Sequence, residues 1–187
     1  EAYVVGGCVR DMVMGRKPHD YDICTAASPD EVIYIFNTKN YEVLPTGIQH
    51  GTVSIVIDKE IFEVTTFRID GEYLDGRHPS SIEFTTDIEK DLARRDFTIN
   101  AMAYAPSTGL IDPFSGLQDI ANKVIRTVGN PKDRFNEDAL RIMRALRFQS
   151  VLGFTIEFST VTEMLAQKEN LLKISKERIN AELNKMF

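Results

Sequence analysis

The sequence predicts an α+β protein in which a head of mixed strands and helices precedes a helical neck. Over residues 1–128, short apolar runs of strand length alternate with helical patterns and turn residues. After Gly129 the pattern changes to helices. With 43% apolar and 27% charged residues, the 187-residue chain has an ordinary folded composition and can form one sizeable core or two small ones. We therefore expect two domains, a head (1–128) and a neck (129–187).

The elements of the head are predicted from apolar runs and turn signals. Strands are expected at 3–5, 20–25, 53–57, 61–66, 97–104 and 124–128, with the third and fourth forming an antiparallel hairpin. Helices are expected after the Gly6-Gly7 break as far as Met14, after Ser28, and at 87–94. The second of these begins with a capping box formed by Ser28 and Glu31, with Pro29 in its first turn. A long loop is expected at 68–84, and the neck helices at about 137–150, 159–168 and 175–187.

Composition and charge exclude some classes of protein. The net charge of −6 argues against a generic nucleic-acid coat, although a local basic patch can still bind phosphates. No apolar run reaches the roughly 20 residues of a membrane span, and the sequence contains no leader in which a cationic segment is followed by an apolar one. Cys8 and Cys24 lie in apolar runs and are expected to be buried, reduced thiols of a cytoplasmic protein. Because the chain lacks an initiator Met and stops at Phe187 inside a helical pattern, we expect a fragment.

Asp20 and Asp22 are the central chemical signal. On a strand, residues two apart face the same side, so the two carboxylates would lie together and repel unless a cation sits between them. Hard oxygen ligands suit Mg²⁺, with Mn²⁺ as a second possibility. A solvated turn or strand edge would explain the same two residues, so the pair alone does not decide between a metal site and a structural role.

The turn at Gly6 and Gly7 strengthens the expectation of a phosphate ligand. Glycines allow close approach of the backbone, and Arg10 offers a fork of donors suited to phosphate. The alternative is a tight strand–helix turn in which Arg10 pairs with Asp11. The sequence here is neither a Walker A loop nor the dinucleotide fingerprint.

Five ordered motifs carry a family resemblance. Gly6-Gly7-Cys8-Val9-Arg10-Asp11 followed by Asp20-Tyr21-Asp22 resembles the first motif of polymerase-β-type nucleotidyltransferases, in the branch of tRNA nucleotidyltransferases and bacterial poly(A) polymerases. Segments similar to that branch's other motifs follow in order: RRDFTINAMA at 94–103, IDPFSGLQDI at 111–120, EDALR at 137–141 and ERINAEL at 177–183. The match covers nearly the whole chain, which resembles the N-terminal part of class II CCA-adding tRNA nucleotidyltransferases.

The resemblance implies a fold and a reaction. The fold would be a polymerase-β-type head, a mixed or antiparallel sheet with flanking helices, followed by an all-helical neck. The reaction would add C, C and A to the tRNA 3′ end from CTP and ATP without a nucleic-acid template, releasing pyrophosphate. Two Mg²⁺ ions would be held by Asp20 and Asp22, and body and tail domains that grip tRNA would follow Phe187. We expect no membrane partner and no obligate protein partner.

Two alternatives stay open, a bacterial poly(A) polymerase and a non-catalytic nucleotide-binding module. The segment 68–79 resembles the flexible loop of full CCA-adding enzymes, although any surface loop would look similar. The acidic composition leans away from a poly(A) polymerase, and the presence of Asp20 and Asp22 leans away from a module without activity.

Asp138, Arg141, Arg144 and Arg147 fall on one arc of a predicted helix, opposite an apolar arc. Cytosine and adenine share an exocyclic amine beside an unprotonated ring nitrogen, so Asp138 could accept from the amine while Arg141 donates to the ring. The family's protein-templated choice of CTP and ATP is what the resemblance implies for this pair. Arg144 and Arg147 would approach the triphosphate or order the pair. A solvated charged face is the alternative.

Four further residues complete the predicted site. Glu63 is expected to join the aspartates as a third carboxylate, the alternative being a solvent-facing strand residue. Arg95 is expected to contact phosphate or ribose, with Asp96 and Asn100 nearby. A cap and turn network at the end of the 87–94 helix is the alternative for these last three.

Overall fold

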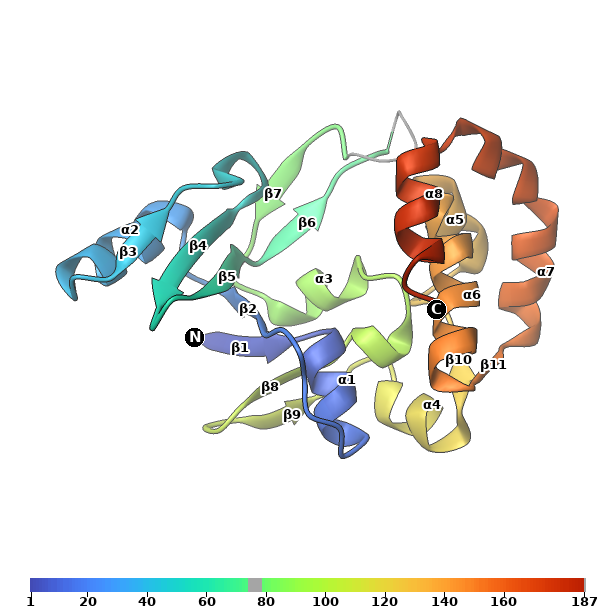
Figure 1. The fold of residues 1–187 in the computed structure, drawn as a ribbon, viewed down its shortest axis with the longest axis horizontal. Coiled ribbons are helices and arrows are strands. Elements are labelled where there is room, and N and C mark those ends of the chain that lie inside the picture. The colour runs from blue at the N-terminus through green and yellow to red at the C-terminus, as the bar shows by residue number, and fades with distance from the viewer. Residues whose placement is uncertain (74–78, 187) are drawn as a thin grey trace.

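A seven-stranded mixed sheet forms the frame of the head (Figure 1). The computed structural model describes residues 1–73 and 79–186. In spatial order the strands are β3 (Glu42–Leu44), β4 (Thr52–Ile57), β5 (Glu60–Thr66), β2 (Asp22–Thr25), β1 (Ala2–Val5), β8 (Ala103–Ala105) and β9 (Gly109–Ile111). The neighbouring strands β2 and β5 are parallel, and the other pairs in the sheet are antiparallel.

Local sequence explains the hairpin and the first long helix. Asp58 and Lys59 turn β4 into β5 with φ angles of 52° and 71°, the left-handed values that a two-residue hairpin turn requires. Helix α2 (Pro29–Thr38) begins with the predicted capping box between Ser28 and Glu31. Its Val32 packs with buried residues of β4 and β5, so α2 covers one face of the sheet.

Helix α3 (Ile88–Ala93) packs on the opposite face of the sheet. The remaining head elements are α1 (Gly7–Val13), η1 (Ile48–His50), β6 (Arg68–Asp70), β7 (Ile82–Phe84), η2 (Thr98–Asn100), α4 (Gly116–Asn122) and β10 (Val124–Ile125). Helix α3 contributes the fully buried Leu92 to a core that includes Tyr3, Val5 and Cys24 of β1 and β2. Because β1 and β2 are antiparallel, the end of β1 and the beginning of β2 lie at the same edge of the sheet, and Gly6, which follows β1, and Asp22, the first residue of β2, border the site described below.

The neck is helical apart from one short strand. It contains α5 (Pro131–Glu137), α6 (Leu140–Leu152), β11 (Thr155–Ile156), α7 (Phe158–Ala166), η3 (Lys168–Lys173) and α8 (Lys176–Leu183). Strand β11 pairs in parallel with β10, so the expectation of an all-helical neck was wrong at this point. Gly153, in a left-handed conformation, ends α6 and returns the chain in extended form beside the head.

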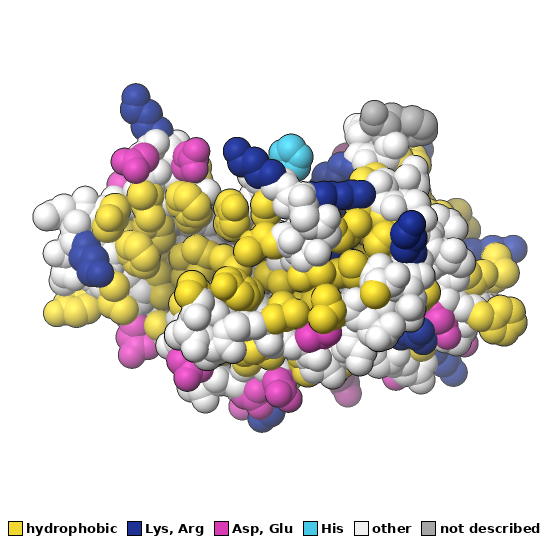
Figure 2. Space-filling view, turned by 90° about the horizontal axis from the view of Figure 1, so that it is seen from below, with side chains coloured by type: hydrophobic (Ala, Val, Ile, Leu, Met, Phe, Trp, Pro, Cys, Tyr) yellow, Lys and Arg dark blue, Asp and Glu magenta, His cyan; other side chains and the backbone are white. Residues whose placement is uncertain are grey.

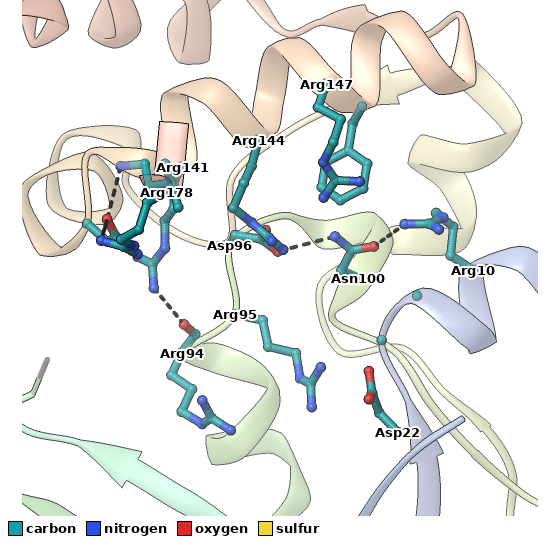
Figure 3. A pocket seen from close by; sticks show the side chains of 15 residues that line it. Arg10, Asp22, Arg94, Arg95, Asp96, Asn100, Arg141, Arg144, Arg147 and Arg178 are labelled. Atoms are coloured by element: carbon teal, nitrogen blue, oxygen red, sulfur yellow. Dashed lines mark hydrogen bonds and ion pairs between the residues drawn. The ribbon is translucent and has the colours of Figure 1, made fainter. Parts of the chain in front are cut away.

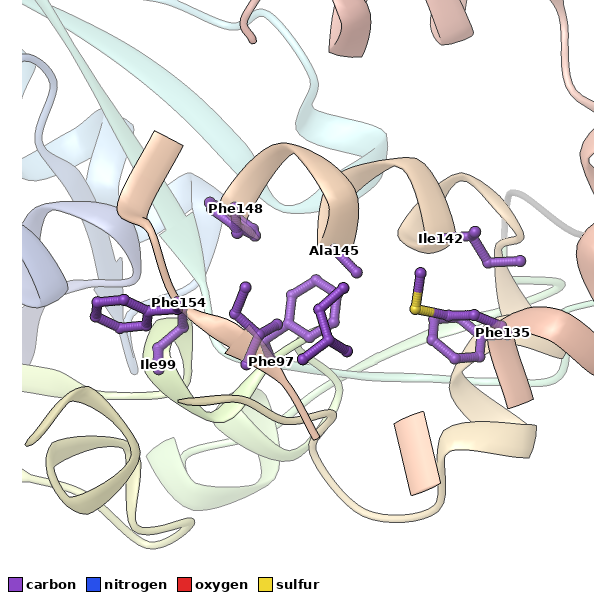
Figure 4. Packing of buried hydrophobic residues seen from close by; sticks show 10 residues of the cluster. Phe97, Ile99, Phe135, Ile142, Ala145, Phe148 and Phe154 are labelled. Atoms are coloured by element: carbon purple, nitrogen blue, oxygen red, sulfur yellow. The ribbon is translucent and has the colours of Figure 1, made fainter. Parts of the chain in front are cut away.

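One apolar core joins residues on both sides of the predicted domain boundary (Figure 4). Phe97, Ile99 and Ile125 of the head pack with Phe135, Ile142, Ala145, Phe148, Phe154, Ile156 and Met164 of the neck. Phe97 and Phe148 meet edge to face, with ring centroids 5.7 Å apart. The division at 128/129 remains a prediction, but the two parts share a buried interior.

Three expectations about secondary structure were wrong. The region 68–84 is not a plain loop, because β6 and β7 pair antiparallel and Tyr73 bridges to Pro79; residues 74–78 of it lie outside the described chain. The run 97–104 is not one strand, because η2 interrupts it where Asn100 N donates to the carbonyl of Phe97. The neck has an additional helix, α5, for which Asn130 is the cap.

No described helix is long and apolar enough to cross a membrane. Figure 2 shows one face of the molecule, where hydrophobic side chains spread over the middle and Lys and Arg side chains stand apart from one another.

Candidate active site

A cavity of about 480 Å³ lies between the sheet, α1 and α3 on one side and α6 and α8 on the other (Figure 3). It is lined by Gly6, Gly7, Arg10, Asp22, Arg94, Arg95, Asp96, Asn100, Asp138, Leu140, Arg141, Arg144, Arg147, Phe148 and Arg178. The structure thus brings together all the residues predicted to bind nucleotide. Seven of these fifteen side chains are arginines, so the cavity is suited to an anion despite the acidic chain.

The Gly6-Gly7 turn forms one wall of the cavity. Gly6 has a φ of 75°, and a Cβ there would stand 2.8 Å from Arg95 Nη1 and 3.8 Å from Asp22 Oδ2. The positive φ therefore favours glycine here, and any side chain at this position would also displace the Arg95 guanidinium. Arg10, which begins the last turn of α1, donates through Nη1 to Asn100 Oδ1 (2.8 Å) and through Nε to Asp11 Oδ1 (2.9 Å). The Arg10–Asp11 pair foreseen as the alternative is present, while Arg10 still lines the cavity.

Arg95 is held by a buried carboxylate of α3. Asp91 is fully buried and accepts from Arg94 Nη2 (2.8 Å) and Arg95 Nη2 (3.4 Å). Among the described residues, no acceptor bonds to the buried Arg95 Nε. A buried donor without a partner is costly, so this guanidinium is suited to an anionic ligand.

Asp96 is the centre of a hydrogen-bond network. Its carboxylate, 7% exposed, accepts from Phe97 N (2.8 Å), Asn100 Nδ2 (3.3 Å) and Arg144 Nη2 (2.6 Å). Burial by itself would raise the pKa of Asp96, but the Arg144 and Arg141 guanidiniums and the hydrogen bonds outweigh it and hold the pKa below its usual value. The turn network foreseen as the alternative for Asp96 and Asn100 is present. Asp96 therefore acts on the cavity mainly through Arg144.

Asp138 does not lie on the arginine helix, contrary to the helix-wheel prediction. Helix α5 ends at Glu137, Asp138 is extended (φ −150°), and α6 begins at Leu140. The backbone breaks because Asp138 Oδ1 accepts from Leu140 N (3.0 Å), as a capping carboxylate does. The Asp138 carboxylate also accepts from Arg178 Nη2 of α8 at 2.7 Å.

Arg141 and Asp138 both line the cavity but are not paired with each other. Arg141 is 9% exposed, and its guanidinium donates to the Glu137 carboxylate and to the backbone carbonyls of Arg134 (2.9 Å) and Arg94 (3.3 Å). Each member of the predicted base-reading pair therefore has its own partner of opposite charge, which fixes its direction.

Arg144 and Arg147 follow on successive turns of α6. Arg144 pairs with Asp96 and lies 3.7 Å from Glu182 Oε1, and the neighbouring carboxylates raise the pKa of Arg144. Arg147 Nε donates to Glu182 Oε2 at 2.5 Å. Glu182 is a buried residue of α8, so the C-terminal helix supplies counter-charge to the arginine face of α6.

The predicted metal-binding carboxylates border a second cavity of about 740 Å³, which includes Asp20, Asp22 and Glu63. Asp22 and Glu63 are paired across the parallel strands β2 and β5 and so face the same side of the sheet. The predicted strand at 20–25 was wrong at its beginning, because Asp20 lies before β2. The first paired residue of β2 is Asp22, which lies opposite Val5, the last residue of β1. Asp22 borders both cavities.

The three carboxylates are separate groups in this structure. Within residues 1–73 and 79–186, no group of three or more His, Cys, Asp or Glu side chains is gathered closely enough to hold a metal ion. Asp20 and Asp22 are exposed, and none of the three has an ion pair or hydrogen bond with another described side chain. Available carboxylate oxygens facing one cavity fit a hard divalent cation in donor type.

Sequence reasoning missed four lining residues and left Gly6 out of its site list. Arg94 and Arg178 belong to motifs already recognised, and adjacency to Arg95 could have indicated Arg94. Leu140 and Phe148 are apolar positions of α6 that no sequence signal separates from the core.

The fold and the arginine-lined cavity define a head that is suited to an anionic ligand, and a family model matches this part of the chain. The chain belongs to the family described as the poly A polymerase head domain, whose model matches residues 2–126. A second model, described as a probable RNA and SrmB-binding site of polymerase A, matches residues 153–187.

Its relatives are named CCA-adding enzymes. The chain is 49% identical over 187 residues to the one from Oceanobacillus iheyensis, and 50% identical to that of Staphylococcus aureus strain Mu3. In both cases all of the chain is covered but only 46% of the relative, so the chain spans less than half the length of the curated relatives it matches.

Solved structures give the same result. The Bacillus stearothermophilus CCA-adding enzyme in complex with CTP is similar over 100% of this chain and 44% of its own, with 42% identity and a TM-score of 0.89. A tRNA nucleotidyltransferase complexed with a primer tRNA and an incoming ATP analogue covers 98% of this chain and 52% of its own, with 33% identity and a TM-score of 0.78. The Thermotoga maritima CCA-adding enzyme complexed with tRNA covers 99% and 42%, with 32% identity and a TM-score of 0.79.

Proposed function

We propose that this chain is the catalytic head and neck of an enzyme that adds C, C and A to the tRNA 3′ end from CTP and ATP. One observation carries the proposal: a single cavity holds a carboxylate–guanidinium set, Asp138 and Arg141, at one end and the Gly6-Gly7 turn with Arg10 and Asp22 at the other (Figure 3). A nucleoside triphosphate has the same polarity, with a base at one end and phosphates at the other.

Base choice follows from the direction of the hydrogen bonds. The Asp138 carboxylate accepts from an exocyclic amine and Arg141 donates to the adjacent ring nitrogen, as cytosine and adenine require. Uracil and guanine present a carbonyl beside a ring N–H, so both bonds fail. Both Asp138 oxygens already accept a hydrogen bond, Oδ1 from Leu140 N and Oδ2 from Arg178 Nη2, so an exocyclic amine would use a second lone pair of this carboxylate. Arg141 would use the N–H groups that its bonds to Glu137 and to the backbone carbonyls leave over. No nucleic-acid template is needed.

The protein's own groups serve the transfer step by binding charge. Arg10, Arg95, Arg144 and Arg147 are placed to contact the triphosphate, and their charges favour departure of pyrophosphate when the tRNA 3′-hydroxyl attacks the α-phosphate. Asp22, with Asp20 and Glu63, would hold Mg²⁺ (or Mn²⁺) where the two cavities meet. When bound, two such ions lower the pKa of the attacking hydroxyl and neutralise the leaving group.

The wider context is also part of the proposal. A cytoplasmic location is supported by Cys8 and Cys24, which are free and buried. Bacterial poly(A) polymerase remains the second candidate, because the matching family model bears the name of that enzyme.

One assay separates the candidates. The full-length protein is given tRNA lacking CCA, tRNA ending in CC and a non-tRNA RNA, with CTP or ATP and Mg²⁺. We expect two C additions and then one A on tRNA only. Long A tails would instead identify a poly(A) polymerase, and nucleotide binding without incorporation would identify a non-catalytic module.

A further inference from the structure

Three guanidiniums of the cavity surround one aromatic ring. The Cζ atoms of Arg147, Arg10 and Arg144 lie 4.2, 5.3 and 5.6 Å from the centroid of the Phe148 ring. All three are within the roughly 6 Å over which a cation is attracted to an aromatic face. Arg10 comes from α1 of the head, whereas Arg144 and Arg147 come from α6, so the ring joins cations from both sides of the cavity.

Each of these guanidiniums has a carboxylate as its second partner. Asp11 pairs with Arg10, Asp96 with Arg144, and Glu182 with Arg147. Three like charges around one ring repel each other, and the side chains are only 12%, 33% and 15% exposed, so water screens them poorly. The negative face of an aromatic ring offsets this repulsion without taking up any further guanidinium N–H group.

The ring itself cannot easily move. Phe148 is 4% exposed, belongs to the core shared by head and neck, and packs edge to face on the fully buried Phe97 (Figure 4). It also lines the cavity. An aliphatic side chain of similar size would fill the same core space but would give no electrostatic support to the three arginines.

We propose that Phe148 is a positioning residue, whose ring holds Arg10, Arg144 and Arg147 together as one receptor for the triphosphate. The inference rests on the proposed function, because it assigns these arginines to phosphate binding. It adds a role for a residue that belongs to the apolar core and makes no polar contact of its own.

The test changes the charge distribution of the ring while keeping its shape. In the full-length protein, residue 148 is replaced by mono-, di- and trifluorophenylalanine, which progressively weaken the negative face of the ring. Dissociation constants for CTP and for inorganic pyrophosphate are measured by calorimetry. The matched control is the same series at Phe154, which is equally buried (4%) in the same core and, within the described chain, has no guanidinium over its ring.

We expect both dissociation constants to rise stepwise at position 148, by about tenfold for the trifluoro variant, and to stay constant at position 154. KM for CTP should rise more than kcat falls, whereas a merely structural role would shift the melting temperature and leave both dissociation constants unchanged. A flat series at position 148, equal slopes at the two positions, or no pyrophosphate binding by the unsubstituted protein would overturn the proposal. Failure to extend tRNA would contradict the proposed function instead, since the pyrophosphate series does not depend on it.

Discussion

Replacing Asp96 with Asn tests the buried network behind the arginine face. The substitution keeps the shape but removes the charge that Arg144 meets at 2.6 Å. Breaking one partner of a buried ion pair costs about 3–5 kcal/mol, but Arg144 is 33% exposed and keeps Glu182 at 3.7 Å. We therefore expect a loss of about 2–3 kcal/mol in the free energy of unfolding, at or just below the lower limit of that range. Urea denaturation at pH 7 measures it.

The pH dependence of that loss carries the sharper test. Because the folded-state pKa of Asp96 lies below its usual value, the folded protein keeps the charge while the unfolded chain takes up a proton. The stabilisation is fully present above about pH 4 and is lost as the pH falls through the folded-state pKa. The difference between the two proteins should thus be constant from pH 7 to 5 and shrink below about pH 4. A difference under about 0.5 kcal/mol at pH 7, equal to that of the exposed Asp133→Asn control, would refute the reasoning.

Three other predictions concern the metal-binding edge, base choice and the thiols. Glu63→Ala should lower turnover at least tenfold, roughly the effect of losing a group that supports a metal site. Its melting temperature should match that of Glu42→Ala, a control at another exposed residue. Near-normal turnover would exclude Glu63 from the site. Asp138→Ala should relax discrimination against UTP and GTP by about 1–3 kcal/mol in kcat/KM, and unchanged selectivity with normal activity would contradict base reading by this carboxylate. Burial raises the pKa of Cys24 to about 12 and also raises the pKa of Cys8. Neither thiol should therefore react with iodoacetamide at pH 8 until urea unfolds the protein. Rapid labelling of the native protein would contradict this prediction by showing that the thiols are accessible. Since the unfolded chain loses the Cys24 proton first, stability should also fall between about pH 9 and 12.

Periodicity and turn chemistry predicted the helices and turns that are determined by residues close together in the sequence. The capping box of α2 and the hairpin at Asp58 and Lys59 depend on residues a few positions apart, and both are present. The region 68–84 was misjudged because β6 and β7 are only three residues long and depend on pairing with each other rather than on an apolar pattern. Helix α5 could have been predicted, because Asn130 followed by Pro131 is an N-cap signal.

The site was predictable in membership but not in geometry. Sequence reasoning identified the three aspartates and five of the seven arginines that line the cavity, because each residue type is the one its chemistry needs, and it missed Arg94 and Arg178. The motifs could not show that Asp138 leaves the helix to cap α6, since the break depends on its hydrogen bond to Leu140 N. Nor could they show that Arg178 and Glu182, in the last helix, would supply the counter-charges, because those pairings span 35 residues or more. Long-range partners of charged side chains follow from the tertiary fold alone.

The core shared by head and neck sets a rule for building chimeras between relatives. A graft that exchanges only the arginine helix would place new apolar side chains against Phe97, Ile99 and Ile125, residues of the recipient's own head. Because close-packed interiors tolerate volume changes poorly, such a hybrid should have a lower melting temperature than either parent. This loss of stability would mask any change in nucleotide preference. Transplanting these three positions together with the helix would carry the matching half of the interior. The arginine helix and its packing partners in the head should therefore be exchanged together as one unit.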